Sequence, residues 1–440
     1  MNDRPTLSRP VAIPQTRLSR LARLGSMASG VAGGMAVEGV RQLGRGERPE
    51  LRDLLLTPSN ISRVTDQLAR MRGAAMKVGQ LVSMDTGDVL PPELAQIMAR
   101  LRAEADHMPP KQLKSVLNST WGPDWLKQFR RFDVRPIAAA SIGQVHRAQT
   151  RDGRDLALKI QYPGVRRSID SDVTNVGALI KVSGLLPPGL DMGPLLDEAR
   201  KQLHEETDYA REGAQLRRFG ALMADVPDVV LPELAEDLTT ETVLAMSFVA
   251  GTPVEDMAEA PQDMRDRIGA QLIDLTLREL FALRVMQTDP NFANFLYDAE
   301  ARQLVLLDFG AARDIPERVV DQYRALMRAG LAEDRAALER VSKEIGFFAP
   351  DSAAHHKAAI LDMIWSVFGA LRAPGAFDFA DPTLQDEMRV AGMALGADRT
   401  FAHVPPMDVL FVQRKFAGMF LLAARLGARV DVREVVGRYV

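Results

Sequence analysis

The chain has 440 residues, of which 46% are hydrophobic, and is long enough to bury a full core in two or three folding units. Its 55 basic and 58 acidic residues give a net charge of -3, which argues against nucleic acid as the main partner. The absence of cysteine excludes disulfides, zinc–thiolate sites and thiol catalysis. The six histidines are scattered along the sequence, so we expect no histidine metal cluster.

Residues 1–50 form a basic, glycine-rich leader. Arginines cluster between residues 4 and 23, with leucines at helical spacing, which is typical of a basic amphipathic helix at a membrane surface. Small residues then recur at every fourth position from Gly25 to Gly33, a spacing that lets helices approach closely. The apolar run stops at Glu38, short of the roughly 20 residues that a membrane span needs. Peripheral membrane attachment, self-association as a homodimer, a flexible leader and a cleaved transit peptide all fit this composition.

Residues 51–125 are expected to form an all-helical extension. Apolar residues alternate spacings of three and four from Ile61 to Val82, behind a helix-start signal at residues 59–60. Lys77 and Gln80 share a different face of this helix and could enter a cleft on a neighbouring domain. Periodicity alone favours an ordinary solvated surface there. Two further helices are expected, one after the prolines at 91–92 and one around residues 113–117.

Residues 126–250 are expected to form a β-rich small lobe. Residues 137–146 occupy the position of the glycine loop of a kinase, and a hairpin signal at Asp152-Gly153 leads to a strand that carries Lys159. Lys159 would bind the α and β phosphates of a nucleotide. The loop residues that would face the phosphates are Ala138, Ala139, Ala140 and Ser141. Because each Cβ restricts positive φ and holds backbone N–H groups back, this loop should grip phosphates differently from a glycine loop.

The second half of the small lobe supplies an acid and a hinge. A helix predicted over residues 194–223 carries several acids, and a kinase-like lobe needs one of them to hold Lys159. The spacing leaves open which acid this is, although Glu205, Asp208 and Glu212 would lie on one stripe. A strand is predicted over residues 242–249, followed by a hinge at residues 250–251. The backbone groups that would contact adenine belong to Met246, Ser247, Phe248 and Val249.

Residues 286–310 carry the chemistry. Asp289 and Asn294 are five positions apart, and Asp308-Phe309-Gly310 follows an apolar strand. Kinase-like folds use this arrangement to hold a nucleophile and metal ions against a triphosphate. Asp289 would orient or deprotonate the acceptor, while Asn294 and Asp308 would bind Mg²⁺. The sequence therefore predicts ATP and Mg²⁺ as ligands of an α+β, two-lobed kinase-like fold, with residues 251–440 as a mostly helical large lobe.

Two departures from a protein kinase stand out. Thr288 takes the place of the arginine that usually precedes the catalytic aspartate, and no Ala-Pro-Glu anchor follows Gly310. The first removes the usual partner of an activation-loop phosphate, and the second removes part of a peptide dock. Both argue against regulation by loop phosphorylation and against peptide phosphorylation.

These motifs together resemble the UbiB-type, aarF-domain atypical kinases. The resemblance covers most of the chain, and the joint occurrence of its motifs is highly specific. The matching segments are Lys77-Val78-Gly79-Gln80 (the KxGQ motif), Arg72-Gly73-Ala74-Ala75, the alanine loop, Lys159, residues 160–165, Glu206-Thr207-Asp208 (the ExD motif), Asp289, Asn294, Asp308-Phe309-Gly310 and the leader. The resemblance implies a bilobal protein-kinase-like fold with an all-α N-terminal extension that carries the KxGQ motif.

The resemblance also implies roles for individual residues. In the family, the helix that bears Lys77, Gly79 and Gln80 covers the site where a protein kinase takes its substrate. Glu206 and Asp208 would contact that helix from the small lobe. By its position in the motif, Glu212 would be the partner of Lys159. This implied role replaces the solvated surface that periodicity alone favours for Lys77.

The activity implied by the resemblance is a slow, lipid-responsive, Mg²⁺-dependent ATPase that supports ubiquinone biosynthesis. Its expected partners are membrane lipid or isoprenoid and quinone intermediates, and enzymes of the quinone pathway. The expected location is the bacterial cytoplasm, peripheral on the inner membrane, with mitochondria as the alternative. Two other functions share the same pocket: a kinase for an unknown protein or small molecule, and a non-catalytic nucleotide-binding scaffold for lipid enzymes. The tail departs from some bacterial relatives, because none of its apolar runs is long enough to span a bilayer.

Overall fold

The computed structural model describes residues 68, 71–85, 107–140, 142–183, 192–398, 400–401, 403 and 405–440. The chain divides into two compact units. Unit 1 comprises Met1–Ser83, Leu90–Gly213 and Leu234–Phe248, and unit 2 comprises Met84–Val89, Ala214–Glu233 and Val249–Val440. The predictions for the leader at residues 1–50, for the helix after residues 91–92 and for Ser141 lie outside the described residues.

Unit 1 contains a five-stranded antiparallel sheet in the order β1-β3-β4-β6, with β2 paired to β3. Its strands are β1 (Phe129–Phe132), β2 (Ala138–Ala139), β3 (Gly143–Thr150), β4 (Asp155–Gln161) and β6 (Val243–Ser247). The β3–β4 turn contains Gly153 at φ +97°, a backbone conformation that glycine adopts without strain. The hairpin at Asp152-Gly153 and the strand that carries Lys159 are therefore both present.

Alternation along β4 sends its side chains to two different faces. Leu156, Leu158 and Ile160 join an aromatic core with Trp125 and Phe129, near α6 (Pro110–Trp121) and η1 (Trp125–Gln128). Helix α6 starts with a proline at its first position, and Gly122, at φ +86°, caps its C-terminal end. The strand period then puts Lys159 on the face opposite this core.

The helices that accompany this sheet differ from the prediction in two places. The structure has α4 (Arg72–Asp85), α7 (Val165–Ser183), α8 (Met192–Glu206) and α9 (Tyr209–Leu222), which begins in unit 1 and continues into unit 2. Helix α7 has no counterpart in the prediction. The single helix expected over residues 194–223 is wrong, because the chain breaks between α8 and α9. At the break, Gln161 donates a hydrogen bond to the Thr207 carbonyl, and the Asp208 carboxylate accepts one from the Arg211 amide at the start of α9. Glu205 and Glu212 therefore lie on different helices and share no stripe.

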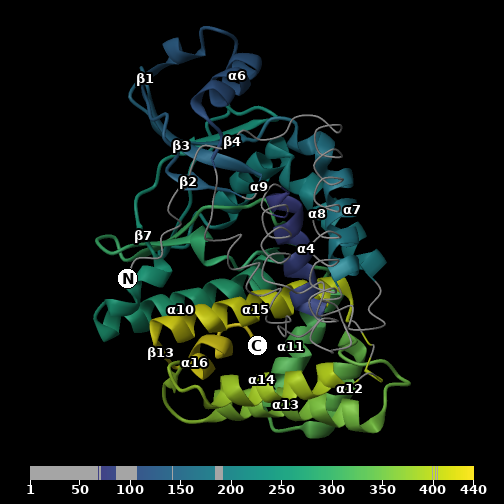
Figure 1. The fold of residues 1–440 in the computed structure, drawn as a ribbon. Helices are drawn as coiled ribbons and strands as arrows, with labels where there is room; N and C mark the ends of the chain where they lie inside the picture. The colour runs from purple at the N-terminus through teal and green to yellow at the C-terminus, as the bar shows by residue number, and fades with distance from the viewer. Residues whose placement is uncertain are drawn as a thin grey trace, which may run out of the picture. The chain divides into compact units, whose positions relative to one another are not determined.

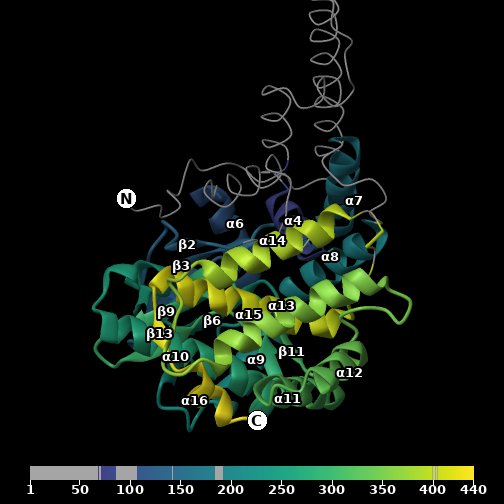
Figure 2. The same cartoon turned by 90° about the horizontal axis from the view of Figure 1, so that it is seen from below.

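Unit 2 is mostly helical. Its helices are η2 (Val254–Glu259), α10 (Gln262–Arg278), η3 (Glu279–Leu283), η4 (Phe292–Asn294), α11 (Glu317–Leu331), α12 (Arg335–Ile345), α13 (Ala354–Arg372), α14 (Thr383–Ala397), α15 (Met407–Leu426) and α16 (Val432–Gly437). Helices α10 and α15 run side by side (Figure 1), and so do α13 and α14 (Figure 2). Helix α15 is the apolar tail helix that the sequence predicts.

Short strands order the loops of unit 2. One small sheet has the order β5-β10-β9-β7, built from β5 (Val229–Val230), β7 (Thr252–Pro253), β9 (Phe295–Asp298) and β10 (Gln303–Leu306). The others pair β8 (Val285–Gln287) with β11 (Ala312–Asp314), and β12 (Phe377–Asp378) with β13 (Arg429–Val430). Because β8 ends just before Thr288 and β11 begins just after Ala311, their pairing brings together the two ends of the stretch that is predicted to be catalytic.

Among the residues that the structure describes, no helix combines the length and the hydropathy that crossing a membrane would require.

Candidate functional site

The strand lysine of unit 1 is held by a carboxylate from α9. The Nζ of Lys159 lies 2.7 Å from Oε1 and 3.0 Å from Oε2 of Glu212. The Lys159 side chain is 11% exposed and that of Glu212 is 2% exposed. Of the acids that the spacing left open, Glu212 is the one that the structure brings to Lys159. A lysine held this way keeps its ammonium group extended, at a point where a phosphate oxygen could approach.

The KxGQ segment contributes a second lysine pair within unit 1. Lys77 lies on α4 and its Nζ forms an ion pair with the carboxylate of Glu206 at the end of α8. Lys77 is buried, as is Gly79, so this face is not the solvated surface that periodicity alone suggested. The side chain of Gln80 lies outside the described residues. The Asp208 carboxylate caps α9, so one acid of the ExD motif holds Lys77 while the other fixes the helix that carries Glu212.

The alanine loop continues the sheet instead of wrapping around an open space. Ala138 pairs with Val145, and Ala139 pairs with Gln144. The Ile137 amide donates to the Val145 carbonyl, and the Ala140 amide donates to the Gly143 carbonyl, both at 2.8 Å. No described residue of the loop has a positive φ. These two N–H groups are therefore already committed to the sheet, unlike the free amides of a glycine loop.

A glycine is needed where the loop turns into β3. A Cβ at position 143 would lie 2.4 Å from the carbonyl oxygen of Ile160 on β4. Real Cβ atoms do not approach a backbone oxygen so closely, so glycine alone permits this contact. Gly143 thus sets how near the loop lies to the strand of Lys159.

The segment predicted to contact adenine lies at the end of β6. Met246 pairs with Ala157 and Ser247 pairs with Leu156, while the Phe248 amide donates to the Asp155 carbonyl at 2.8 Å. The Arg147 guanidinium lies 3.9 Å from the centre of the Phe248 ring, a cation–π contact. Unit 1 ends at Phe248, and Val249 belongs to unit 2.

Hydrogen bonds from the backbone and from side chains hold together the stretch of unit 2 that is predicted to be catalytic. Thr288 donates to the Ala311 carbonyl from both its amide, at 3.2 Å, and its hydroxyl, at 2.9 Å. The Leu307 amide donates to the Asn294 carbonyl at 3.1 Å, which places the segments of Asn294 and Asp308 side by side. Thr288 thus replaces the usual arginine with a short link across the stretch.

Asn294 and Asp308 fit the metal role predicted for them. Both side chains are partly exposed, and one carboxylate oxygen of Asp308 accepts a hydrogen bond from the Gly310 amide at 2.9 Å. An amide oxygen and a carboxylate oxygen are hard ligands of the kind that Mg²⁺ prefers. Phe309 points into the core of unit 2, where its ring centre lies 5.0 Å from that of Phe219. These residues could therefore hold a Mg²⁺ ion.

Comparison with known proteins places the chain in a family. The ABC1 atypical kinase-like domain matches residues 100–342. The chain belongs to the ABC1 atypical kinase-like family. The atypical kinase COQ8 of Saccharomyces cerevisiae is 38% identical over 426 residues, which span 96% of this chain and 85% of that protein. The atypical kinase COQ8B of Rattus norvegicus is 37% identical over 437 residues, which span 98% of this chain and 82% of that protein.

A solved structure supports the same conclusion. The structure of Rv3197 from Mycobacterium tuberculosis in complex with erythromycin matches with a TM-score of 0.63 at 25% identity. The match covers 85% of this chain and 93% of that chain. The predicted kinase-like fold class and the resemblance to the UbiB and aarF-domain proteins are both confirmed.

Sequence reasoning missed the contacts that this atypical kinase draws from α15. Arg414 donates a hydrogen bond to Asp289, with Nη2 3.0 Å from Oδ1. Its neighbour Lys415 lies 3.1 Å from a carboxylate oxygen of Glu279, and both side chains of this second pair are fully buried. Burial raises the pKa of Glu279 above its ordinary value, against the opposing pull of Lys415. Since α15 lies more than a hundred residues after Asp289, no local pattern could reveal these contacts.

Helix α15 also packs directly against the backbone beside Asp289. A Cβ at Gly418 would lie 2.2 Å from the Cβ of Pro290. Glycine at that position lets the helix approach the residue after Asp289 closely. The tail helix therefore helps to fix the position of Asp289.

Proposed function

We propose that the chain is a Mg²⁺-dependent ATPase of the atypical-kinase type, which transfers the terminal phosphate of ATP to water. The observation that carries the proposal is the buried pair of Lys159 and Glu212, in a chain that also has Asn294 and Asp308 with partly exposed side chains. A lysine held by a helix carboxylate and a metal-binding Asp-Phe-Gly are the two parts that phosphoryl transfer needs in kinase-like proteins.

Each residue has a role in this proposal. Lys159 binds phosphate oxygens, and Glu212 keeps its ammonium group in position. Asn294 and Asp308 hold Mg²⁺, which would neutralise charge on the phosphates. Asp289 orients the attacking water and accepts its proton, held in place by Arg414. The backbone of residues 246–249 would receive the adenine.

Water is favoured over a peptide as the acceptor. Thr288 replaces the arginine that a protein kinase uses for activation, and two amides of the alanine loop are taken by the sheet. The family resemblance implies that the helix of Lys77 occupies the peptide site, and the buried pair of Lys77 with Glu206 is consistent with a fixed helix. If this is so, Lys77→Ala should raise autophosphorylation, measured by incorporation of labelled phosphate.

The biological setting is taken from the relatives. Two of the matching proteins are named as mitochondrial atypical kinases of the COQ8 type. We therefore infer support of ubiquinone or another isoprenoid-lipid pathway, with quinone intermediates, membrane lipid and pathway enzymes as partners. The inner membrane of a bacterium and the mitochondrion are the two locations compatible with this role.

The deciding experiment removes one metal ligand. Asp308→Asn should abolish Mg²⁺-dependent hydrolysis of ATP, because an amide oxygen carries no charge for the metal. The matched control is Asp314→Asn, whose exposed carboxylate pairs with Arg218 on the surface and should be dispensable. An unchanged rate in Asp308→Asn would overturn the assignment of the site.

A further inference from the structure

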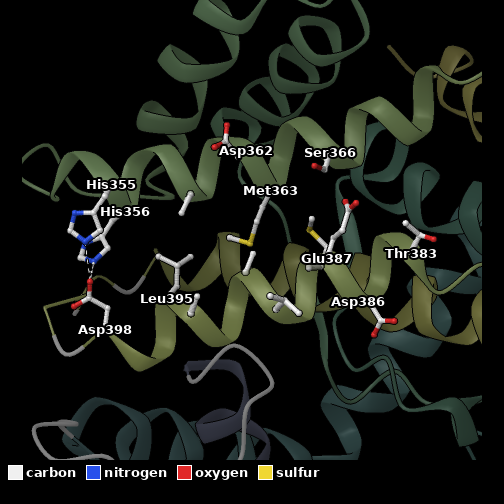
Figure 3. A pocket seen from close by; sticks show the side chains of 15 residues that line it. His355, His356, Asp362, Met363, Ser366, Thr383, Asp386, Glu387, Leu395 and Asp398 are labelled. Atoms are coloured by element: carbon white, nitrogen blue, oxygen red, sulfur yellow. Dashed lines mark hydrogen bonds and ion pairs between the residues drawn. The ribbon is translucent and has the colours of Figure 1, made fainter.

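A cavity of about 780 Å³ that is widely open to solvent lies in unit 2 between α13 and α14. Its middle is lined by apolar side chains such as Met363 and Leu395, and His355, His356 and Asp398 lie at one end (Figure 3). The nucleotide residues proposed above do not line it. This polar end is what distinguishes the cavity from an ordinary gap between two helices.

The three polar side chains converge on one point. His355 and His356 occupy the first turn of α13, and Asp398 directly follows α14. The Nε2 atoms of His355 and His356 lie 3.0 Å and 2.8 Å from the same Oδ2 of Asp398. All three ligand atoms lie within 4.8 Å of one another. The expectation of no histidine cluster is therefore wrong, because Asp398, which follows α14, lies beside the two adjacent histidines at the start of α13.

The spacing of these atoms suits a small divalent cation. A tetrahedral ion with ligands at 2.0–2.1 Å separates its ligand atoms by about 3.3 Å. The two observed nitrogen–oxygen distances fall short of this value by a few tenths of an ångström. Small outward movements of the side chains would therefore admit an ion. Two imidazoles and one carboxylate are a ligand set of zinc sites that leave a fourth position open.

The carboxylate is already oriented by its neighbours. The other oxygen of Asp398, Oδ1, accepts hydrogen bonds from the amide and the hydroxyl of Thr400, at 2.9 Å and 2.7 Å. His356 is buried with its ring against Phe401, at 5.1 Å between ring centres. Metal ligands are commonly fixed in this way by hydrogen bonds and packing around them. Oδ2 is thereby directed to the imidazoles.

We propose that His355, His356 and Asp398 bind one Zn²⁺ ion through Nε2, Nε2 and Oδ2, with water at the fourth position. The ion joins the start of α13 to the residue that follows α14, at that end of the cavity. Without the ion, both imidazoles share a single carboxylate oxygen. This site is independent of the proposed ATPase activity and uses none of its residues.

The test is zinc binding by the untagged full chain after removal of metals with a chelator. Zn²⁺ is titrated by calorimetry in excess Mg²⁺, which fills sites made of oxygen ligands alone. We expect one Zn²⁺ per chain, and at least a tenfold weaker affinity in His355→Ala and in Asp398→Asn. The matched control is His204→Ala, which removes a single surface histidine 3.0 Å from Asp170 and should leave zinc binding unchanged.

Two further measurements separate binding from misfolding. The His355 side chain is 66% exposed, so the metal-free melting temperature of His355→Ala should equal that of the parent chain. Zn²⁺ should raise the melting temperature of the parent chain and not that of His355→Ala. Absence of stoichiometric zinc binding in the parent chain would overturn the proposal. Equal zinc affinity in the parent chain, His355→Ala and Asp398→Asn would overturn it as well.

Discussion

Two lysine–glutamate ion pairs in this protein consist of the same residue types but differ in their surroundings. Lys159 and Glu212 join a strand to a helix in unit 1, and the lysine keeps 11% of its side-chain surface exposed. Lys415 and Glu279 join α15 to η3 in unit 2, and neither side chain has any exposed surface. The first pair is the one proposed to contact a nucleotide. The second is sealed, with Gln287 and the Phe295 ring beside the lysine, and can serve only the fold.

Both pairs are buried, and they differ in the small exposed part of the Lys159 side chain, which the fully enclosed Lys415 lacks. A sealed ion pair carries a desolvation cost that its own attraction barely offsets, so its removal as a pair is tolerated while removal of one partner is not. If Lys159 binds phosphate as proposed, no apolar replacement can supply its charge. Replacement by methionine should therefore lower mainly the activity at Lys159 and mainly the stability at Lys415.

The largest effect is expected at Lys159. Lys159→Met removes the cation proposed to bind the phosphates and should lower kcat for Mg²⁺-dependent ATP hydrolysis by at least about a hundredfold. Steady-state hydrolysis at saturating ATP measures the change, with circular dichroism to verify that the chain is folded. Lys127→Met, which changes an exposed surface lysine of the same unit, serves as the control. A rate within twofold of the parent chain would remove Lys159 from the mechanism.

Lys415→Met should act on stability instead. It leaves the carboxylate of Glu279 buried without its partner, which costs about 3–5 kcal/mol. Urea denaturation gives the loss, and ATP hydrolysis per folded molecule should fall far less than in Lys159→Met. The double variant Lys415→Met with Glu279→Leu should recover most of the lost stability. If the double variant is as unstable as the single one, the sealed pair has a role that the comparison misses.

A buried histidine makes the stability of the chain depend on pH, so the two lysine variants must be compared at one fixed pH. His146 lies on β3 beside β4, and burial lowers its pKa from 6.5 to about 4. Between these values the unfolded chain binds a proton that the folded chain excludes, so stability falls as the pH drops below 6.5. The loss should reach roughly 3 kcal/mol near pH 4 and vanish above pH 6.5. Urea denaturation from pH 7 to pH 4 measures it.

The control for this pH effect is the same titration on His146→Gln. The pH dependence of the free energy of unfolding should lack the contribution of His146 in this variant. The other contributions should remain, including the opposite one from the raised pKa of Glu279. An identical pH slope in both chains would show that His146 does not titrate as described.

A smaller effect is expected at Arg414, which holds Asp289. Arg414→Met should lower kcat by about tenfold, because a displaced carboxylate orients water poorly. Arg414→Lys, which keeps a donor of the same charge, should retain more activity, and KM for ATP should change little in both. The two kinetic constants are measured together. A change in KM alone would mean that Arg414 acts on nucleotide binding and not on Asp289.

The smallest effect is expected in the alanine loop. Ala139→Gly removes a Cβ that restricts the backbone and should shift affinity toward ATP relative to ADP, by less than about tenfold. Calorimetry with both nucleotides measures the ratio. Ala301→Gly, in an exposed turn of unit 2, should leave the ratio unchanged. Equal ratios in the parent chain and Ala139→Gly would leave the loop with a structural role only.

Many of the strands and helices could be predicted from the sequence, because the patterns that indicate them involve residues close together in the chain. Alternation and a hairpin glycine located Lys159, and helical periodicity located α6, α10 and α15. Glu212 was one of several candidate acids by spacing, and its assignment needed the family motif, because the break at Thr207 invalidates the stripe. That break depends on Gln161, which lies 46 residues earlier in the chain.

Contacts between distant segments could not be predicted. Arg414 meets Asp289 across 125 residues, and Asp398 meets His356 across 42 residues. No periodicity or motif links such positions, because each contact depends on how helices that are distant in the sequence pack against other segments. The histidine pair at 355–356 was visible as two adjacent letters, but its third ligand was not.

The fate of the terminal phosphate of ATP tests the central claim most directly. The full chain is incubated with γ-labelled ATP and Mg²⁺, with and without liposomes, and label is followed in inorganic phosphate, in protein and in extracted lipid. An ATPase predicts that the label appears as inorganic phosphate, at a rate that Lys159→Met abolishes. Label that accumulates on the protein or on a lipid at the rate of ATP consumption would contradict transfer to water.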